Sequence, residues 1–122
     1  MALGRIPLST LANHAFVKMN GLGNEIVVVD LRGKSDPLNA DRVRWVGARP
    51  ETHFDQMMVL LDPRTPGTEA YVRIYNIDGS EAEACGNGMR CVGWAVWEQT
   101  HRSAQRYETR AGILDVAVRD VA

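Results

Sequence analysis

Apolar residues along this chain fall into short runs that predict strands, separated by polar or glycine- and proline-rich turns. Residues 14–19 and 25–31 flank the turn at residues 20–24 and predict a hairpin. Residues 55–61 are continuously apolar after their first positions, and residues 70–77 alternate, so both predict strands. The first part of the chain is therefore expected to be rich in β-structure.

Two segments predict helices. Residues 36–39 supply the residue types that begin a helix, and a surface helix is expected to follow and to end before Pro50. Residues 87–99 would place apolar side chains around nearly the whole circumference of a helix. Such a helix is normally buried on all sides.

Two further strands, at residues 105–110 and 113–119, predict a second hairpin across Gly112. A sheet curled around the apolar helix would cover it, because a single domain has few other ways to bury such a helix. The sequence thus predicts an α+β fold, a curved and mostly antiparallel sheet wrapped around a central buried helix. We expect residues 1–13 to be a loosely ordered leader and residues 14–122 to form this lobe.

Bulk composition narrows the classes of partner. The 122 residues have the size of one domain, and 14 Lys and Arg against 15 Asp and Glu leave a net charge of -1. The sequence contains no run of like charge, so nothing in it favours binding to nucleic acid or to an anionic membrane surface. The first fifteen residues contain neither a secretory signal nor a segment that could span a membrane. We expect a cytoplasmic protein whose partner is a small molecule or another protein chain.

Cys85 lies where a predicted strand turns into the apolar helix, and Cys91 follows six positions later. If the helix begins near Cys85, its unpaired amides and positive dipole end favour the thiolate over the thiol. A thiolate can act as a nucleophile, a metal ligand or a general base. The spacing of the two cysteines fits no zinc motif, so no metal site is expected. A nucleophilic role for Cys85 has no histidine signature to support it, but this alternative stays open. For Cys91, in mid-helix, we favour packing as a small apolar residue.

The sequence favours chemistry without a cofactor. Gly21 and Gly23 begin a dinucleotide-binding pattern, but Ile26 occupies the position of its third glycine. A pyridoxal phosphate enzyme needs a Schiff-base lysine, and the only lysines, Lys18 and Lys34, have no supporting context.

The segment from Asp78 to Cys91, DGSEAEACGNGMRC, resembles the first-cysteine signature of the diaminopimelate epimerase family. That family interconverts LL- and meso-diaminopimelate, a precursor of lysine and peptidoglycan, without a cofactor. Residues 16–25, 54–56 and 75–80 are similar to other segments of the family and follow in its order. The resemblance therefore covers most of residues 16–91 and implies one lobe of the diaminopimelate epimerase-like fold.

Two departures from the family pattern are visible. Glu25 stands where an aspartate is usual, and residues 51–53 precede Phe54 where a glycine-containing turn is usual. The second departure could alter the loop that presents Gln56.

The resemblance implies roles for individual residues. Cys85 would be one of two catalytic cysteines. Neutral amides can hold the ammonium and carboxylate groups of a zwitterion without adding charge beside a thiolate base, and amides at a helix start can bind the α-carboxylate. On the residues alone, turn or cap chemistry would be the ordinary role of Asn24 and Asn76. The residues expected to contact substrate are Asn24, Gln56, Asn76, Gly86 and Asn87.

Inversion of a stereocentre needs a second group that supplies a proton on the opposite face. Six residues along a helix rise about 9 Å and turn about 240°, so Cys91 cannot face the same carbon as Cys85, or form a disulfide with it, if both lie on this helix. The resemblance implies that the second base comes from a later carboxy-terminal lobe, which is absent from this sequence. We expect an amino-terminal lobe that is inactive by itself and self-associates through its exposed apolar surface.

Two other functions remain open. The chain could belong to another isomerase of the same superfamily, of the proline racemase type or the phenazine-pathway type. It could also be a non-catalytic lobe that binds a ligand or assembles with another chain.

Overall fold

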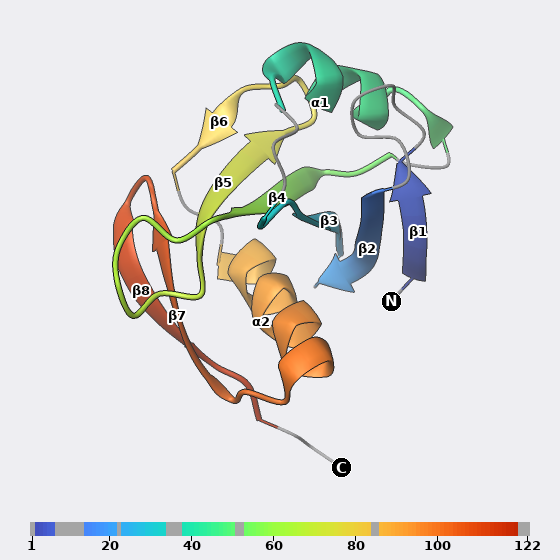
Figure 1. The fold of residues 1–122 in the computed structure, drawn as a ribbon. Coiled ribbons are helices and arrows are strands. Elements are labelled where there is room, and N and C mark those ends of the chain that lie inside the picture. The colour runs from blue at the N-terminus through green and yellow to red at the C-terminus, as the bar shows by residue number, and fades with distance from the viewer. Residues whose placement is uncertain are drawn as a thin grey trace.

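A computed structural model of the chain describes residues 2–6, 14–21, 23–33, 38–50, 53–83 and 86–119 (Figure 1). The strands within these ranges are β1 (Ala2–Ile6), β2 (His14–Gly21), β3 (Asn24–Asp30), β4 (Gln56–Leu61), β5 (Ala70–Asn76), β6 (Glu81–Ala82), β7 (Ala104–Thr109) and β8 (Gly112–Ala117). The α-helices are α1 (Ala40–Gly47) and α2 (Gly86–Thr100).

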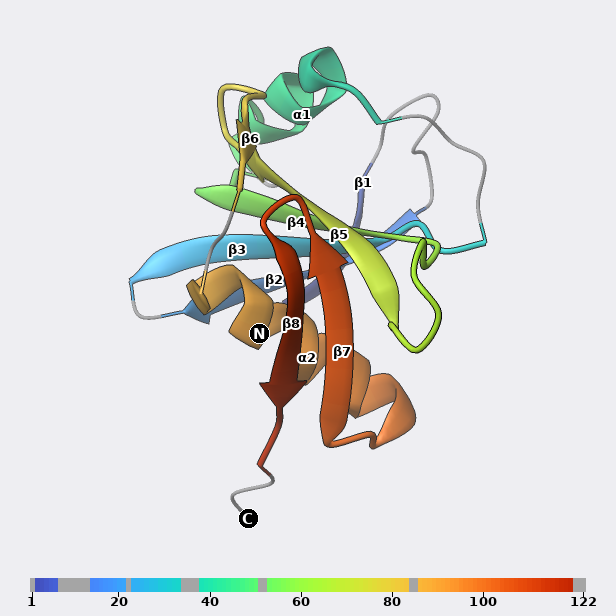
Figure 2. The same ribbon diagram turned by 90° about the vertical axis from the view of Figure 1, so that its left-hand side faces the viewer.

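One sheet contains all the described strands, in the order β1-β2-β3-β4-β5-β7-β8, with β6 paired to β5. Neighbouring strands are antiparallel except for two parallel pairs, β3 with β4 and β5 with β7. The sheet curves around α2, and α1 covers part of its other face (Figures 1 and 2). The predicted α+β architecture, a curved and mostly antiparallel sheet around a central helix, is confirmed.

The central strands β3 and β4 are buried on both faces, which explains their continuous apolar sequences. Successive side chains of a strand point to opposite faces. Ile26 and Val28 therefore belong to the core on the α2 side, whereas Val27 and Val29 belong to the core on the α1 side. Parallel strands are usually covered on both faces in this way.

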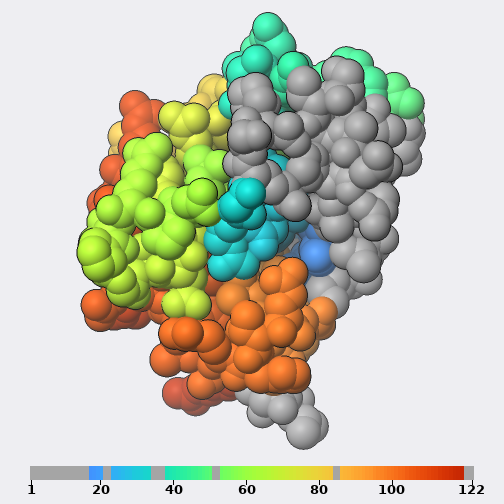
Figure 3. Space-filling view, in the orientation of Figure 1, coloured from blue at the N-terminus to red at the C-terminus, as the bar shows by residue number. Residues whose placement is uncertain are grey.

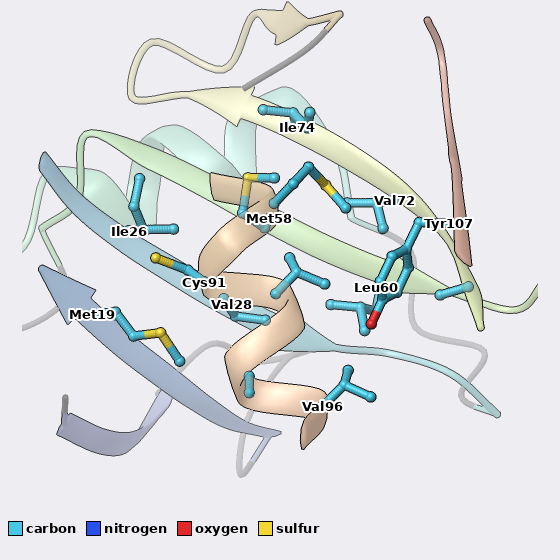
Figure 4. Close-up of a cluster of buried hydrophobic side chains, with 14 residues drawn as sticks. Met19, Ile26, Val28, Met58, Leu60, Val72, Ile74, Cys91, Val96 and Tyr107 are labelled. Carbon is cyan, nitrogen blue, oxygen red and sulfur yellow. The ribbon is translucent and has the colours of Figure 1, made fainter. Parts of the chain in front are cut away.

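The side of α2 that faces the sheet carries most of its buried side chains (Figure 4). Cys91 is 7% exposed within this core, so its predicted packing role is confirmed. Burial on all sides, in contrast, is not complete, because Arg90, Trp94 and Glu98, each four residues from the next, are exposed. The described strands form an open sheet that leaves this stripe uncovered, and Figure 3 shows part of α2, in orange, at the surface.

The helices lie close to their predicted positions. Asn39 caps α1, its side chain accepting a hydrogen bond from the Arg42 amide at 3.0 Å, and the helix ends at Gly47, before Pro50. α2 spans Gly86–Thr100, against a prediction of residues 87–99. Within the described part of the chain, neither helix combines the length and the apolarity needed to cross a lipid bilayer.

The amino terminus differs from the loosely ordered leader expected over residues 1–13. Ala2–Ile6 form β1, which pairs antiparallel with β2. Without β1, the backbone N–H and C=O groups along one side of β2 would have no strand partner, and pairing satisfies them. Residues 7–13 lie outside the described residues.

Candidate active site

One edge of the sheet gathers the segments in which substrate-contacting residues are predicted. The start of β3, the start of β4, the end of β5 and the start of α2 all lie on the left of Figure 2. Gln56 pairs with Ile26 of β3 on one side and with Asn76 of β5 on the other. Since neighbouring strands lie about 4.8 Å apart, Gln56 and Asn76 are adjacent, and Asn24 begins the next strand across.

The three predicted amide residues share one face of the sheet. Side chains two positions apart in a strand lie on the same face, and each amide is two positions from a residue of the core on the α2 side. For Asn24, Gln56 and Asn76 these core residues are Ile26, Met58 and Ile74, respectively. The amides therefore continue the face that packs against α2, at the point where that face reaches solvent.

Hydrogen bonds link two of these amides to each other. Gln56 Nε2 donates to Asn76 Oδ1 at 3.4 Å, and Asn76 Nδ2 donates to Ser80 Oγ at 3.0 Å. The backbone N–H of Asn76 also donates to the Ser80 carbonyl at 2.8 Å. Both ends of the Asn76 side-chain amide are thus engaged, which fixes its orientation.

The turn after β5 holds Asn76 in place through Asp78. Asp78 Oδ1 accepts hydrogen bonds from the hydroxyl and the amide of Ser80, at 2.6 and 2.9 Å, and these bonds lower the pKa of the Asp78 carboxyl. Arg44 of α1 donates to the Asp78 carbonyl at 3.2 Å. Asp78 and Ser80 were not among the predicted site residues, although Asp-Gly-Ser after a strand is a turn signal.

Acid will weaken this turn. A carboxyl whose pKa is lowered in the folded state contributes stability above its unfolded pKa, and this contribution is lost as the pH falls through the folded value. The ordinary value for Asp78 is 3.8. We expect Asp78→Asn to unfold at a lower temperature than the unsubstituted chain at neutral pH, and the gap to narrow as the pH falls below 3.8 and to close below the lowered pKa of the folded state. Thermal unfolding followed by circular dichroism at stepped pH values measures it; a gap that stays constant down to the most acidic sample would contradict the role of Asp78.

The start of α2 adds backbone donors to the same region. Gly86 is exposed and Asn87 is half-buried, and the first four N–H groups of a helix have no partner within it. Ile74 and Gly86 line one cavity together, which places the helix start beside the end of β5. Cys85, the predicted base, precedes Gly86 directly in the sequence and lies outside the described residues.

That cavity, of about 490 Å³, is largely separate from the predicted site. Its lining comes mainly from the start of α2 and the β7–β8 hairpin, with Ile74 of β5, and Gly86 is the one predicted site residue among the described residues that line it. The cavity is mostly apolar because side chains of β8 line it. β8 is the last strand of the described sheet, and its Ile113 is 53% exposed. The amides instead form an open, polar edge beside the cavity. Across the described residues, no cluster of three or more His, Cys, Asp or Glu side chains could hold a metal ion.

Comparison with known proteins decides the family. A family model described as diaminopimelate epimerase matches residues 16–122. The chain belongs to the diaminopimelate epimerase family. The diaminopimelate epimerase of Nitrobacter hamburgensis is 60% identical over 107 residues, which are 88% of this chain and 37% of that protein. That of Bradyrhizobium sp. strain BTAi1 is 57% identical over 108 residues, again 88% and 37%. The chain thus spans about 37% of the length of these relatives.

Several solved structures share the fold of this chain, although their sequences are only distantly similar to it. A phenazine biosynthesis protein of the PhzF family from Enterococcus faecalis has a TM-score of 0.64 at 12% identity, covering 86% of this chain and 40% of that one. A hydroxyproline epimerase from Agrobacterium vitis, solved with trans-4-hydroxy-L-proline bound, has a TM-score of 0.61 at 18% identity, covering 86% and 37%. The predicted fold is therefore shared with these two solved structures.

Proposed function

We propose that this chain carries one half of the active site of a diaminopimelate epimerase. The observation that supports this most directly is the placement of Asn24, Gln56 and Asn76 on one face at one edge of the sheet, beside the start of α2. Membership of the family supplies the reaction, the interconversion of LL- and meso-diaminopimelate.

In the proposed reaction, Cys85 is one of two proton-transferring bases. Its thiolate accepts the α-proton from one face of the stereocentre, and the thiol of a second base on a carboxy-terminal lobe donates a proton to the opposite face. Each turnover therefore inverts the centre and moves one proton onto Cys85 and one off the second thiol. The reverse direction exchanges these roles, so both groups must be able to hold and release a proton.

The amides have a complementary role in this proposal. Asn24, Gln56 and Asn76 offer both donors and acceptors, so they can bind the ammonium and carboxylate groups of the substrate while remaining neutral. The backbone amides of Gly86 and Asn87 bind the α-carboxylate, because the start of a helix favours a negative charge. A neutral site keeps the thiolate free of a competing anion.

Diaminopimelate will protect Cys85 of this chain from alkylation by iodoacetamide. Gln56→Ala and Asn76→Ala should each weaken that protection by about tenfold, since each removes a hydrogen bond to a charged group. Gln99→Ala is the matched control, because Gln99 is an exposed amide at the far end of α2. Mass spectrometry of the modified peptide gives the rate and separates Cys85 from the buried Cys91.

Several outcomes would count against the proposal. Equal protection by proline or by an aromatic acid would favour another isomerase of the superfamily. Absence of protection, with alkylation no faster than that of a model thiol, would favour a non-catalytic lobe. Rapid epimerisation of LL-diaminopimelate in deuterated water by this chain alone would show that the second base does not come from another lobe.

The partners in this proposal are diaminopimelate and a carboxy-terminal lobe. Self-association of the chain is a further prediction, resting on exposed apolar side chains such as Trp94 and Ile113. The cytoplasmic setting also remains a prediction from the sequence.

A further inference from the structure

Glu25 lies between β2 and the segment that leads into β4. Its Oε2 atom is 3.4 Å from Lys18 Nζ and 3.3 Å from His53 Nδ1. The contact with His53, followed by the charge of Lys18, lowers the pKa of Glu25, so the carboxylate is ionised at neutral pH. One carboxylate oxygen thus joins a residue of β2 to a residue three positions before Gln56.

The backbone of Glu25 is held by the same segment. The Asp55 amide donates to the Glu25 carbonyl at 2.8 Å, and the Glu25 amide donates to Asp55 Oδ2 at 2.7 Å. Phe54, between His53 and Asp55, is fully buried in the core on the α1 side, and this burial holds the segment of residues 53–55 against the sheet. Side-chain and backbone contacts therefore act on the same short stretch of chain.

These contacts extend the pairing of β3 and β4 toward the site. Ile26 and Gln56 are the first paired residues of the two parallel strands. The contacts of Glu25 with His53 and Asp55 lie one step beyond that pair, next to Asn24. Without them, the pairing of Ile26 with Gln56 would be the last contact that holds the start of β3 beside the start of β4.

We propose that Glu25 and His53 are a positioning pair that sets the separation of Asn24 and Gln56. The role in substrate binding rests on the proposed function, whereas the connection itself does not. Glu25, one departure from the usual family pattern, thus contacts His53, the last residue of the other departure. An aspartate at position 25 would be shorter by roughly 1.5 Å, one carbon–carbon bond, and a residue without a side-chain donor at position 53 could not make this contact.

Amide hydrogen exchange and the side-chain amide resonance of Gln56 test the connection in the substrate-free chain. We expect Glu25→Gln and His53→Ala each to accelerate exchange of the Asp55 amide by about two- to fivefold, the range expected for loss of an exposed ion pair, and to shift the Gln56 resonance. The double variant should change no more than either single one, because both remove the same contact. His53→Lys keeps a side-chain donor opposite the Glu25 carboxylate and should keep exchange slow.

Asp115→Asn is the matched control, since it breaks the exposed Arg106–Asp115 ion pair on β7 and β8. It should leave Asp55 exchange and the Gln56 resonance unchanged. Additive effects of Glu25→Gln and His53→Ala, or unchanged exchange in both, would overturn the proposal. Diaminopimelate titration of the same variants separates the proposed function from the positioning role. If the unsubstituted chain binds no diaminopimelate, the proposed function fails. The exchange rates still decide whether Glu25 and His53 hold Gln56 in place.

Discussion

Replacing Tyr107 by alanine will lower the free energy of unfolding by about 3–5 kcal/mol, the range for removing a large buried aromatic side chain. Tyr107 is fully buried on β7, in the core that α2 packs against. Its hydroxyl donates to Gln105 Oε1 at 2.5 Å. Burial also raises the pKa of this phenol, so it stays protonated as a donor. Alanine would therefore leave both a cavity and an unpaired acceptor.

The second part of the loss comes from a small polar network. Gln105 Nε2 donates to the carbonyls of Gly93 and Arg102, at 3.1 and 2.7 Å, which connects β7 to the middle of α2 and to the segment that follows the helix. Tyr107→Phe keeps the ring and removes the donor to Gln105, so it should cost about 1–3 kcal/mol. Urea unfolding followed by tryptophan fluorescence gives both values. A loss for Tyr107→Ala no greater than for Tyr107→Phe would show that the cavity is not the dominant effect.

Gly79→Ala will be the most damaging small substitution near the site. Gly79 has a φ of 88°, and a Cβ there would lie 2.7 Å from the carbonyl oxygen of Ala40 at the start of α1. The left-handed conformation costs a non-glycine residue about 1–2 kcal/mol. Overpacking against backbone adds about 1–3 kcal/mol, because α1 cannot move away without disturbing its own core. The turn that orients Asn76 would have to shift.

Gly67→Ala is the control for the conformational part of this loss. Gly67 has a similar φ of 86°, and a Cβ there would meet nothing within 4 Å. We expect Gly67→Ala to lose only about 1–2 kcal/mol and to leave the side-chain amide resonances of Asn76 unchanged. Equal losses at the two glycines, measured by urea unfolding, would mean that contact with Ala40 contributes nothing.

Most of the fold could be read from local patterns. The continuous apolar runs of β3 and β4 reflect burial on both faces, and the alternation in β5 reflects one face that is less covered. These are local properties, so periodicity alone located them. β1 escaped prediction because its strand conformation depends on pairing with β2. Five residues near a terminus form a strand when another strand presents an unpaired edge, and the pattern of residues 2–6 does not show this.

The open side of α2 could not be predicted either. Its apolar sequence indicated burial all round, and Trp94 is nonetheless exposed, stacked on Trp97 with ring centroids 5.1 Å apart. Whether a helix face is covered depends on how far the sheet curls and where its strands end. No window of sequence contains that information.

For the candidate site, the sequence by itself determined the residue types and the family. The motif from Asp78 to Cys91 indicated the family and the cysteine, and the similar segments at residues 16–25, 54–56 and 75–80 supplied the amide residues. Only the tertiary structure decided which of the remote residues act together. Strand register brings Gln56 beside Asn76 across twenty positions of sequence, and it brings Glu25 to His53, two departures that looked unrelated along the chain. Contacts of this kind arise from strand pairing and core packing over the whole lobe, so the sequence specifies them only through the complete fold.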